Sequence, residues 1–129
     1  DDPELVGFPC WSPDGRLLAA EQKRDDDDRV VLIDLSRSDS GIVVLTPEHG
    51  RFWPWSFSPD GRRIAMVALR DGAWNVWWVD RTSGEQRQLT DLKRRDVYLR
   101  YPAWSPTGDR IVFELAEVLG DLWRASGVP

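Results

Sequence analysis

The sequence is poor in the residues that form disulfides and metal sites. Its 129 residues include one cysteine, Cys10, and one histidine, His49. A single cysteine excludes an internal disulfide framework, and so few Cys and His residues argue against a zinc site of the usual kind. No apolar run approaches the ~18 residues that cross a bilayer, so we expect no membrane partner.

Motifs for catalysis and for phosphate binding are also missing. No G-x-S-x-G, Walker-type or G-x-G-x-x-G pattern occurs, so we expect no catalytic residues and no cofactor. His49 lacks a nucleophile motif to work with and is interpreted as a loop residue. The acidic run from Asp25 to Asp28 lacks the spacing and the glycine of an EF-hand loop, which favours a solvated loop over a calcium site. The net charge of -5 argues against a nucleic-acid partner.

The sequence is rich in tryptophan, with eight residues, and it contains a turn that recurs. The turn reads "WSPDGR" at 11–16, "FSPDGR" at 57–62 and "WSPTGD" at 104–109. Its prolines, Pro13, Pro59 and Pro106, are 46 and 47 residues apart. A fixed period of about 40 to 50 residues indicates a repeat architecture.

Each repeat is predicted to form short antiparallel strands around this turn. In Ser-Pro-Asp-Gly, Pro presets φ for the second position of a type I turn, Asp suits the third, and Gly supplies a positive φ. The strands at 64–67 and 76–79 are apolar on successive residues, which indicates burial on both faces. Four-stranded sheets covered on both faces stack in series as propeller blades. The predicted strands are 8–12, 17–21, 30–35 and 41–46, then 54–58, 63–68, 75–80 and 85–90, then 101–105, 110–115 and 121–126.

The turn, the apolar strand after it and a closing Leu-Thr at 45–46 and 89–90 make one pattern. This pattern resembles the repeat of the TolB-like propellers, a WD-repeat-like family, and it covers residues 8–126. It departs from the family at Pro54, Phe57, Thr107 and Ser126. The resemblance implies an all-β chain of three four-stranded blades, at approximately 8–46, 52–90 and 101–129, the third lacking its own outer strand.

Three blades do not close a ring, because propellers hold about four to eight. An open arc exposes two sheet faces of roughly 400 Å² each, so we expect two copies to form a six-bladed homodimer, the blade number of TolB itself. Residues 1–7 are a possible closure strand. The chain opens on "DDPELVG" rather than on Met, which leaves two alternatives: part of a longer propeller, or an engineered fragment whose only function is self-assembly.

Candidate binding residues lie in the longer, irregular loops between the second and third strands of each blade and between successive blades. Antiparallel order places these loops on one face, and loops on a rigid scaffold commonly bind ligands. For Trp53 and Trp55 we favour packing between blades over a binding platform, and for the basic segment 93–100 we favour ion pairing. The predicted binding residues are His49, Arg51, Trp53, Trp55, Trp74, Arg94, Arg95 and Tyr98.

The function implied by the resemblance is a non-catalytic scaffold that binds itself and a protein or peptide ligand. An alternative is that these blades belong to an enzyme: the gating propeller of a prolyl-oligopeptidase-like serine peptidase, or a lyase with this fold. The peptidase needs a hydrolase domain downstream of the propeller. Peptidase activity in this chain alone would contradict the scaffold interpretation.

Overall fold

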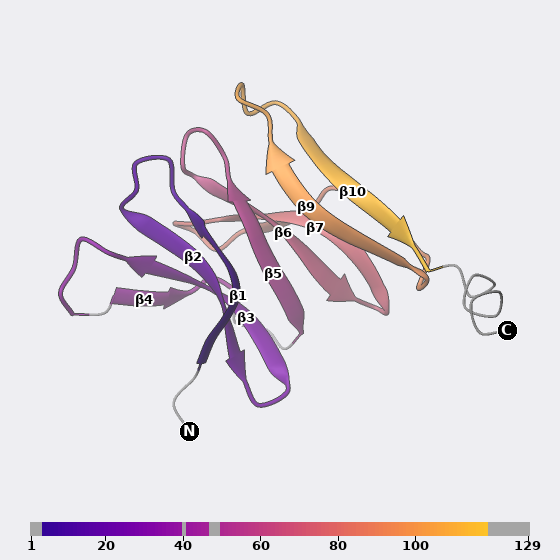
Figure 1. Ribbon diagram of the computed structural model, residues 1–129, viewed down its shortest axis with the longest axis horizontal. Coiled ribbons are helices and arrows are strands. Elements are labelled where there is room, and N and C mark those ends of the chain that lie inside the picture. The colour runs from indigo at the N-terminus through magenta and orange to yellow at the C-terminus, as the bar shows by residue number, and fades with distance from the viewer. Residues whose placement is uncertain (1–3, 40, 47–49, 119–129) are drawn as a thin grey trace, which may run out of the picture.

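The computed structural model describes residues 4–39, 41–46 and 50–118, and every regular element in them is a β-strand. Their ten strands form three antiparallel sheets, which lie side by side in chain order in Figure 1. The first sheet holds β1 (Glu4–Trp11), β2 (Leu17–Arg24), β3 (Asp27–Asp34) and β4 (Gly41–Val44). The second holds β5 (Arg51–Phe57), β6 (Arg63–Arg70), β7 (Ala73–Asp80) and β8 (Gln86–Gln88), and the third holds β9 (Val97–Trp104) and β10 (Ile111–Glu117).

Consecutive strands are neighbours in each sheet, as expected for propeller blades. The first two sheets confirm the predicted blades of four antiparallel strands. The first strand of each sheet begins earlier than predicted, at Glu4, Arg51 and Val97. The strand predicted at 121–126 lies outside the described residues. Within the described part of the chain, no helix is long and apolar enough to cross a membrane.

Of the possible closure strand at residues 1–7, residues 1–3 lie outside the described part of the chain. Its described part, from Glu4, belongs to β1, the inner strand of the first sheet. Glu4, Leu5 and Val6 pair with Lys23, Gln22 and Glu21 of β2. A strand that already pairs along one edge within its own blade is not placed to complete the third blade.

The recurring turn owes its shape to a serine and an aspartate. The serine hydroxyl accepts the backbone N–H five residues later and donates to a carboxylate. In the third copy Thr107 replaces the usual Asp, but Asp109 moves into its role, since it accepts hydrogen bonds from both Ser105 and Thr107. The departure at Thr107 therefore leaves the turn intact. The bonded pairs are Ser12 with Asp14, Ser58 with Asp60, and Ser105 with Asp109.

The Leu-Thr pair completes the hydrogen bonding of the third strand after the fourth strand has ended. Leu45 donates its N–H to the Val30 carbonyl (2.8 Å), and Val30 donates its own N–H to the Thr46 hydroxyl (2.8 Å). Leu89 and Thr90 bond Val76 in the same way. A threonine side chain thus takes the place of a backbone carbonyl.

Two apolar clusters hold the sheets together. The cluster between the first and second sheets includes Ala19 and Leu32 on one side and Phe57, Ile64 and Met66 on the other. The second cluster joins the second and third sheets. Its buried members are Val67, Trp74, Val76 and Leu99.

Candidate functional site

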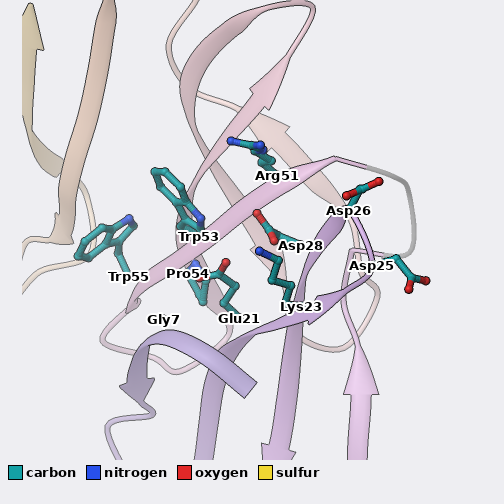
Figure 2. Close-up of a pocket in the computed structure, with 10 residues that line it drawn as sticks. All are labelled: Gly7, Glu21, Lys23, Asp25, Asp26, Asp28, Arg51, Trp53, Pro54 and Trp55. Atoms are coloured by element: carbon teal, nitrogen blue, oxygen red, sulfur yellow. The ribbon is translucent and has the colours of Figure 1, made fainter. Parts of the chain in front are cut away.

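A groove of about 710 Å³ lies where the first two sheets meet. Its floor and walls come from the inner strands of both sheets and from the hairpin between β2 and β3, as Figure 2 shows. The groove lies along β1 and β5, the first strands of the two sheets. The lining residues are Gly7, Glu21, Lys23, Asp25, Asp26, Asp28, Arg51, Trp53, Pro54 and Trp55.

The acidic hairpin is fixed in place by its own turn and by the second sheet. The turn between β2 and β3 puts Asp25 in the left-handed region, with φ of 54°. Aspartate is one of the few residues besides glycine that enters this region readily. The Asp28 N–H donates to the Gly50 carbonyl just before β5 (3.0 Å), which ties the hairpin to the next blade. The acidic run therefore forms one wall of the groove.

Glu21 lies half-buried at the bottom of the groove. Burial raises the pKa of its carboxyl from 4.5 to about 7, and the charge of Asp28 adds to this; a hydrogen bond from the Trp53 side chain and the charge of Lys23 oppose it. Gly7 makes room for this carboxylate. A Cβ on Gly7 would lie 2.1 Å from Glu21 Oε2, and its φ of +83° is also unfavourable for other residues.

Two tryptophans, Trp53 and Trp55, form the aromatic wall of the groove, and each packs against another aromatic ring. Trp53 stacks on Trp74, with ring centroids 4.5 Å apart and planes at 24°. Trp55 meets Tyr101 edge to face, with centroids 5.0 Å apart and planes at 72°. Both Trp53 and Trp55 pack against the second apolar cluster, so the packing interpretation is confirmed for them. They also line the groove.

Of the predicted binding residues, the groove gathers Arg51, Trp53 and Trp55. Arg51 is exposed at the start of β5. Trp74 is buried beneath Trp53 and does not line the groove. His49 lies outside the described residues.

The remaining three candidates lie with the third sheet and do not line the groove. Arg94 donates to Asp96 and to Glu117 (2.6 Å), and these bonds raise its pKa. The guanidinium of Arg95 lies over Gly72, in the turn between β6 and β7. Tyr98 is exposed on the face of β9 that points away from the second sheet.

The predicted ion pairing of the basic segment 93–100 is confirmed at three of its residues. Lys93 pairs with Asp91, Arg94 with Asp96 and Glu117, and Arg100 with Glu114. These pairs lie within the chain, so the charges of the segment are largely matched locally.

Sequence reasoning missed the polar half of the groove. It did not single out Gly7, Glu21 or Lys23, and it considered the Asp25–Asp28 run only as a metal site or a solvated loop. One signal was available: Glu21 interrupts a strand whose counterpart in the second repeat, at Val67, is apolar.

The groove has the chemistry of a binding site for a polar and partly apolar ligand. Aromatic faces, two cations and four carboxylates converge on one concavity. Across the described residues, no three His, Cys, Asp or Glu side chains are grouped so as to hold a metal ion.

Comparisons with known proteins identify the fold. No protein-family model matches the chain. It is similar to the uncharacterized peptidase YuxL of Bacillus subtilis (strain 168), with 27% identity over 118 residues. That similarity covers 83% of this chain but only 17% of YuxL.

Two solved structures share the architecture. TolB from Acinetobacter baumannii superposes with a TM-score of 0.68 at 23% identity, over 84% of this chain and 26% of TolB. A TolB-like protein from Agrobacterium tumefaciens gives a TM-score of 0.68 at 21% identity, over 88% of this chain and 43% of that protein. The all-β fold of TolB-like propeller blades predicted from the repeat is confirmed.

Proposed function

We propose that this chain, which has the fold of TolB-like propeller blades, is a non-catalytic scaffold. It binds a protein or peptide segment in the groove between its first two sheets and closes its ring by pairing with a second copy. The observation that carries the binding role is the groove itself. It combines the Trp53 and Trp55 rings with charged side chains of both signs, and aromatic residues with a polar rim are typical of surfaces that bind proteins.

The hydrogen bonding of the three turn serines supports a non-catalytic role for them. A serine nucleophile needs a base within hydrogen-bond reach and a free path to the substrate. Ser12, Ser58 and Ser105 instead bond a turn carboxylate and a backbone N–H. Their hydroxyls stabilise the turns between strands.

An array of synthetic dodecapeptides of defined sequence tests the binding role. We expect a subset to bind the wild-type chain and to lose binding with Trp55→Ala, which removes part of the aromatic wall. Phe113→Ala is the matched control, since Phe113 is an exposed aromatic residue outside the groove, on the face of β10 toward the second sheet. Equal binding by wild type and Trp55→Ala, or loss with Phe113→Ala alone, would rule out the groove as the binding site.

Light scattering tests ring closure. A homodimer has twice the chain mass of 14.8 kDa. We expect that doubled mass at micromolar concentration. A monomer at that concentration would contradict closure by a second copy.

The similarity to YuxL favours a second candidate function, in which these blades are part of the propeller of a peptidase. In a prolyl-oligopeptidase-like enzyme the propeller controls access to a separate hydrolase domain. This candidate predicts that the isolated chain is monomeric. Both candidates predict that it does not hydrolyse fluorogenic peptides, and hydrolysis would contradict the non-catalytic assignment.

A further inference from the structure

The two most exposed large apolar side chains among the described residues lie on opposite terminal sheets. Val112, on β10 of the third sheet, is 66% exposed, and Trp11, at the end of β1 in the first sheet, is 59% exposed. Soluble chains rarely expose such groups within larger apolar surfaces unless a partner covers them. The equivalent positions in the other repeats indicate which surface could cover each of these side chains.

Trp11 lies on the face of the first sheet that points away from the second. Its neighbour Cys10 packs against the cluster between the two sheets, and successive residues of a strand point to opposite faces. The strand register continues this outer face across all four strands, so that it forms an apolar ladder. The ladder consists of Trp11, Leu18, Ile33 and Ile42.

The positions equivalent to Trp11 in the other repeats are inter-blade contacts. The repeat spacing of 46 and then 47 residues matches Trp11 to Phe57 and to Trp104. Phe57 is 8% exposed and packs in the cluster between the first and second sheets. Trp104 lies at the junction of the third sheet with the second, where its backbone N–H donates to Ser56 Oγ (3.3 Å). In each repeat this aromatic residue faces the preceding blade, and within the described residues no blade precedes the sheet of Trp11.

The surface that receives this aromatic residue also repeats. On the first sheet it includes Ala19, which is fully buried in the same cluster as Phe57. The same spacing matches Ala19 to Ala65, also fully buried, and to Val112. Val112 therefore occupies the receiving position of the third sheet, and among the described residues no aromatic side chain of a following blade packs against it.

We propose that Trp11 of one copy packs against the Val112 face of a second copy, and that the reciprocal contact forms at the other side of the ring. The two new junctions then repeat the geometry of the two junctions inside the chain. This inference rests on the proposed ring closure and names the surfaces that make it.

The contact area is sufficient for a second copy. Four strands at ~4.8 Å spacing and about six residues at ~3.3 Å cover roughly 400 Å² on the first face, and the two described strands of the last face cover roughly 200 Å². A ring of two copies has two such junctions, and each junction buries one face of each kind. The total is roughly 1,200 Å², which reaches the lower limit for specific interfaces. The contacts also continue an established interface, because Phe57 and Ala19 are already buried in one cluster between the first two sheets.

Complementary charges at the two positions test the contact. We expect Trp11→Lys alone and Val112→Glu alone to raise the dimer dissociation constant by roughly a hundredfold or more, because each places an unpaired charge in both apolar junctions. An equimolar mixture of the two variants should recover the dimer mass in light scattering. A mixed dimer has one Lys–Glu junction and one native junction, whereas each variant alone has two mismatched junctions.

Two further variants serve as controls. Trp11→Phe should remain dimeric, because Phe57 fills this position in the second repeat. Val43→Lys should also remain dimeric. Val43 is 54% exposed, but it pairs with Leu32 on the opposite face of the first sheet.

The possible outcomes separate this inference from ring closure itself. A dimeric wild type whose mass is unchanged by Trp11→Lys, or a mixture that fails to recover the dimer, would overturn the proposed contact and leave closure through another surface. A monomeric wild type would overturn both.

Discussion

The hydroxyl of Thr46 is the acceptor for a backbone N–H that the fourth strand of the first sheet does not reach. Thr46 is fully buried, and Val30 donates to its Oγ1 at 2.8 Å. Thr46→Val keeps the shape of the side chain and removes the acceptor. The Val30 N–H is then buried without a partner.

An unpaired buried donor costs about 1–3 kcal/mol of unfolding free energy. For a chain of this size that loss lowers the melting temperature by roughly 3–5 °C per kcal/mol. We expect urea or thermal unfolding followed by circular dichroism to show this loss for Thr46→Val. Thr90→Val should show a similar loss, because Val76 donates to Thr90 Oγ1 at 2.9 Å and this hydroxyl also donates to Asn75.

Thr46→Ser separates hydrogen bonding from packing. It keeps the hydroxyl and removes one methyl group, which costs about 1 kcal/mol. If the hydrogen bond dominates, Thr46→Val is the less stable variant. If Thr46→Val is as stable as wild type while Thr46→Ser is weakened, Thr46 acts through packing and our explanation of the Leu-Thr motif is wrong.

Two other substitutions test the groove and the core. The pKa of Glu21 is raised from 4.5 to about 7, so wild-type stability falls as pH rises through this window, and the penalty is complete above it. Glu21→Gln should exceed wild type by about 1–2 kcal/mol at pH values above the window, since solvent screens the half-buried group, and should match wild type at pH values below it. Equal stabilities at both ends would refute the raised pKa. Met66→Ala should cost about 2–5 kcal/mol in urea unfolding, because Met66 is fully buried in the first cluster. A loss below that range would mean that the cluster collapses around the cavity.

Much of the fold could be predicted from the sequence because its signals are local. The Ser-Pro-Asp-Gly turn acts within a few residues, and its spacing reports the length of each blade. The turn at Thr107 shows the limit of examining one position at a time: the sequence shows only a departure from the pattern there, and the structure shows that Asp109, two residues later, bonds Ser105 instead.

The candidate site was less predictable because it joins different repeats. The sequence grouped Trp74 with Trp53 as loop aromatics, but one ring is buried under the other. It placed Arg94 and Tyr98 with Arg51, although they lie with a different sheet. Glu21 and Trp53 are far apart in the chain, and only the approach of the two sheets brings them together.

The sequence by itself determined the kind of unit: turn chemistry and runs of apolar residues specify four-stranded blades with aromatic residues at fixed positions. The tertiary structure decided which copies of each position are covered. Phe57 and Trp11 occupy equivalent positions, yet one is buried and the other is exposed. Burial depends on whether a neighbouring sheet is present, and a pattern that repeats along the chain does not specify its own ends.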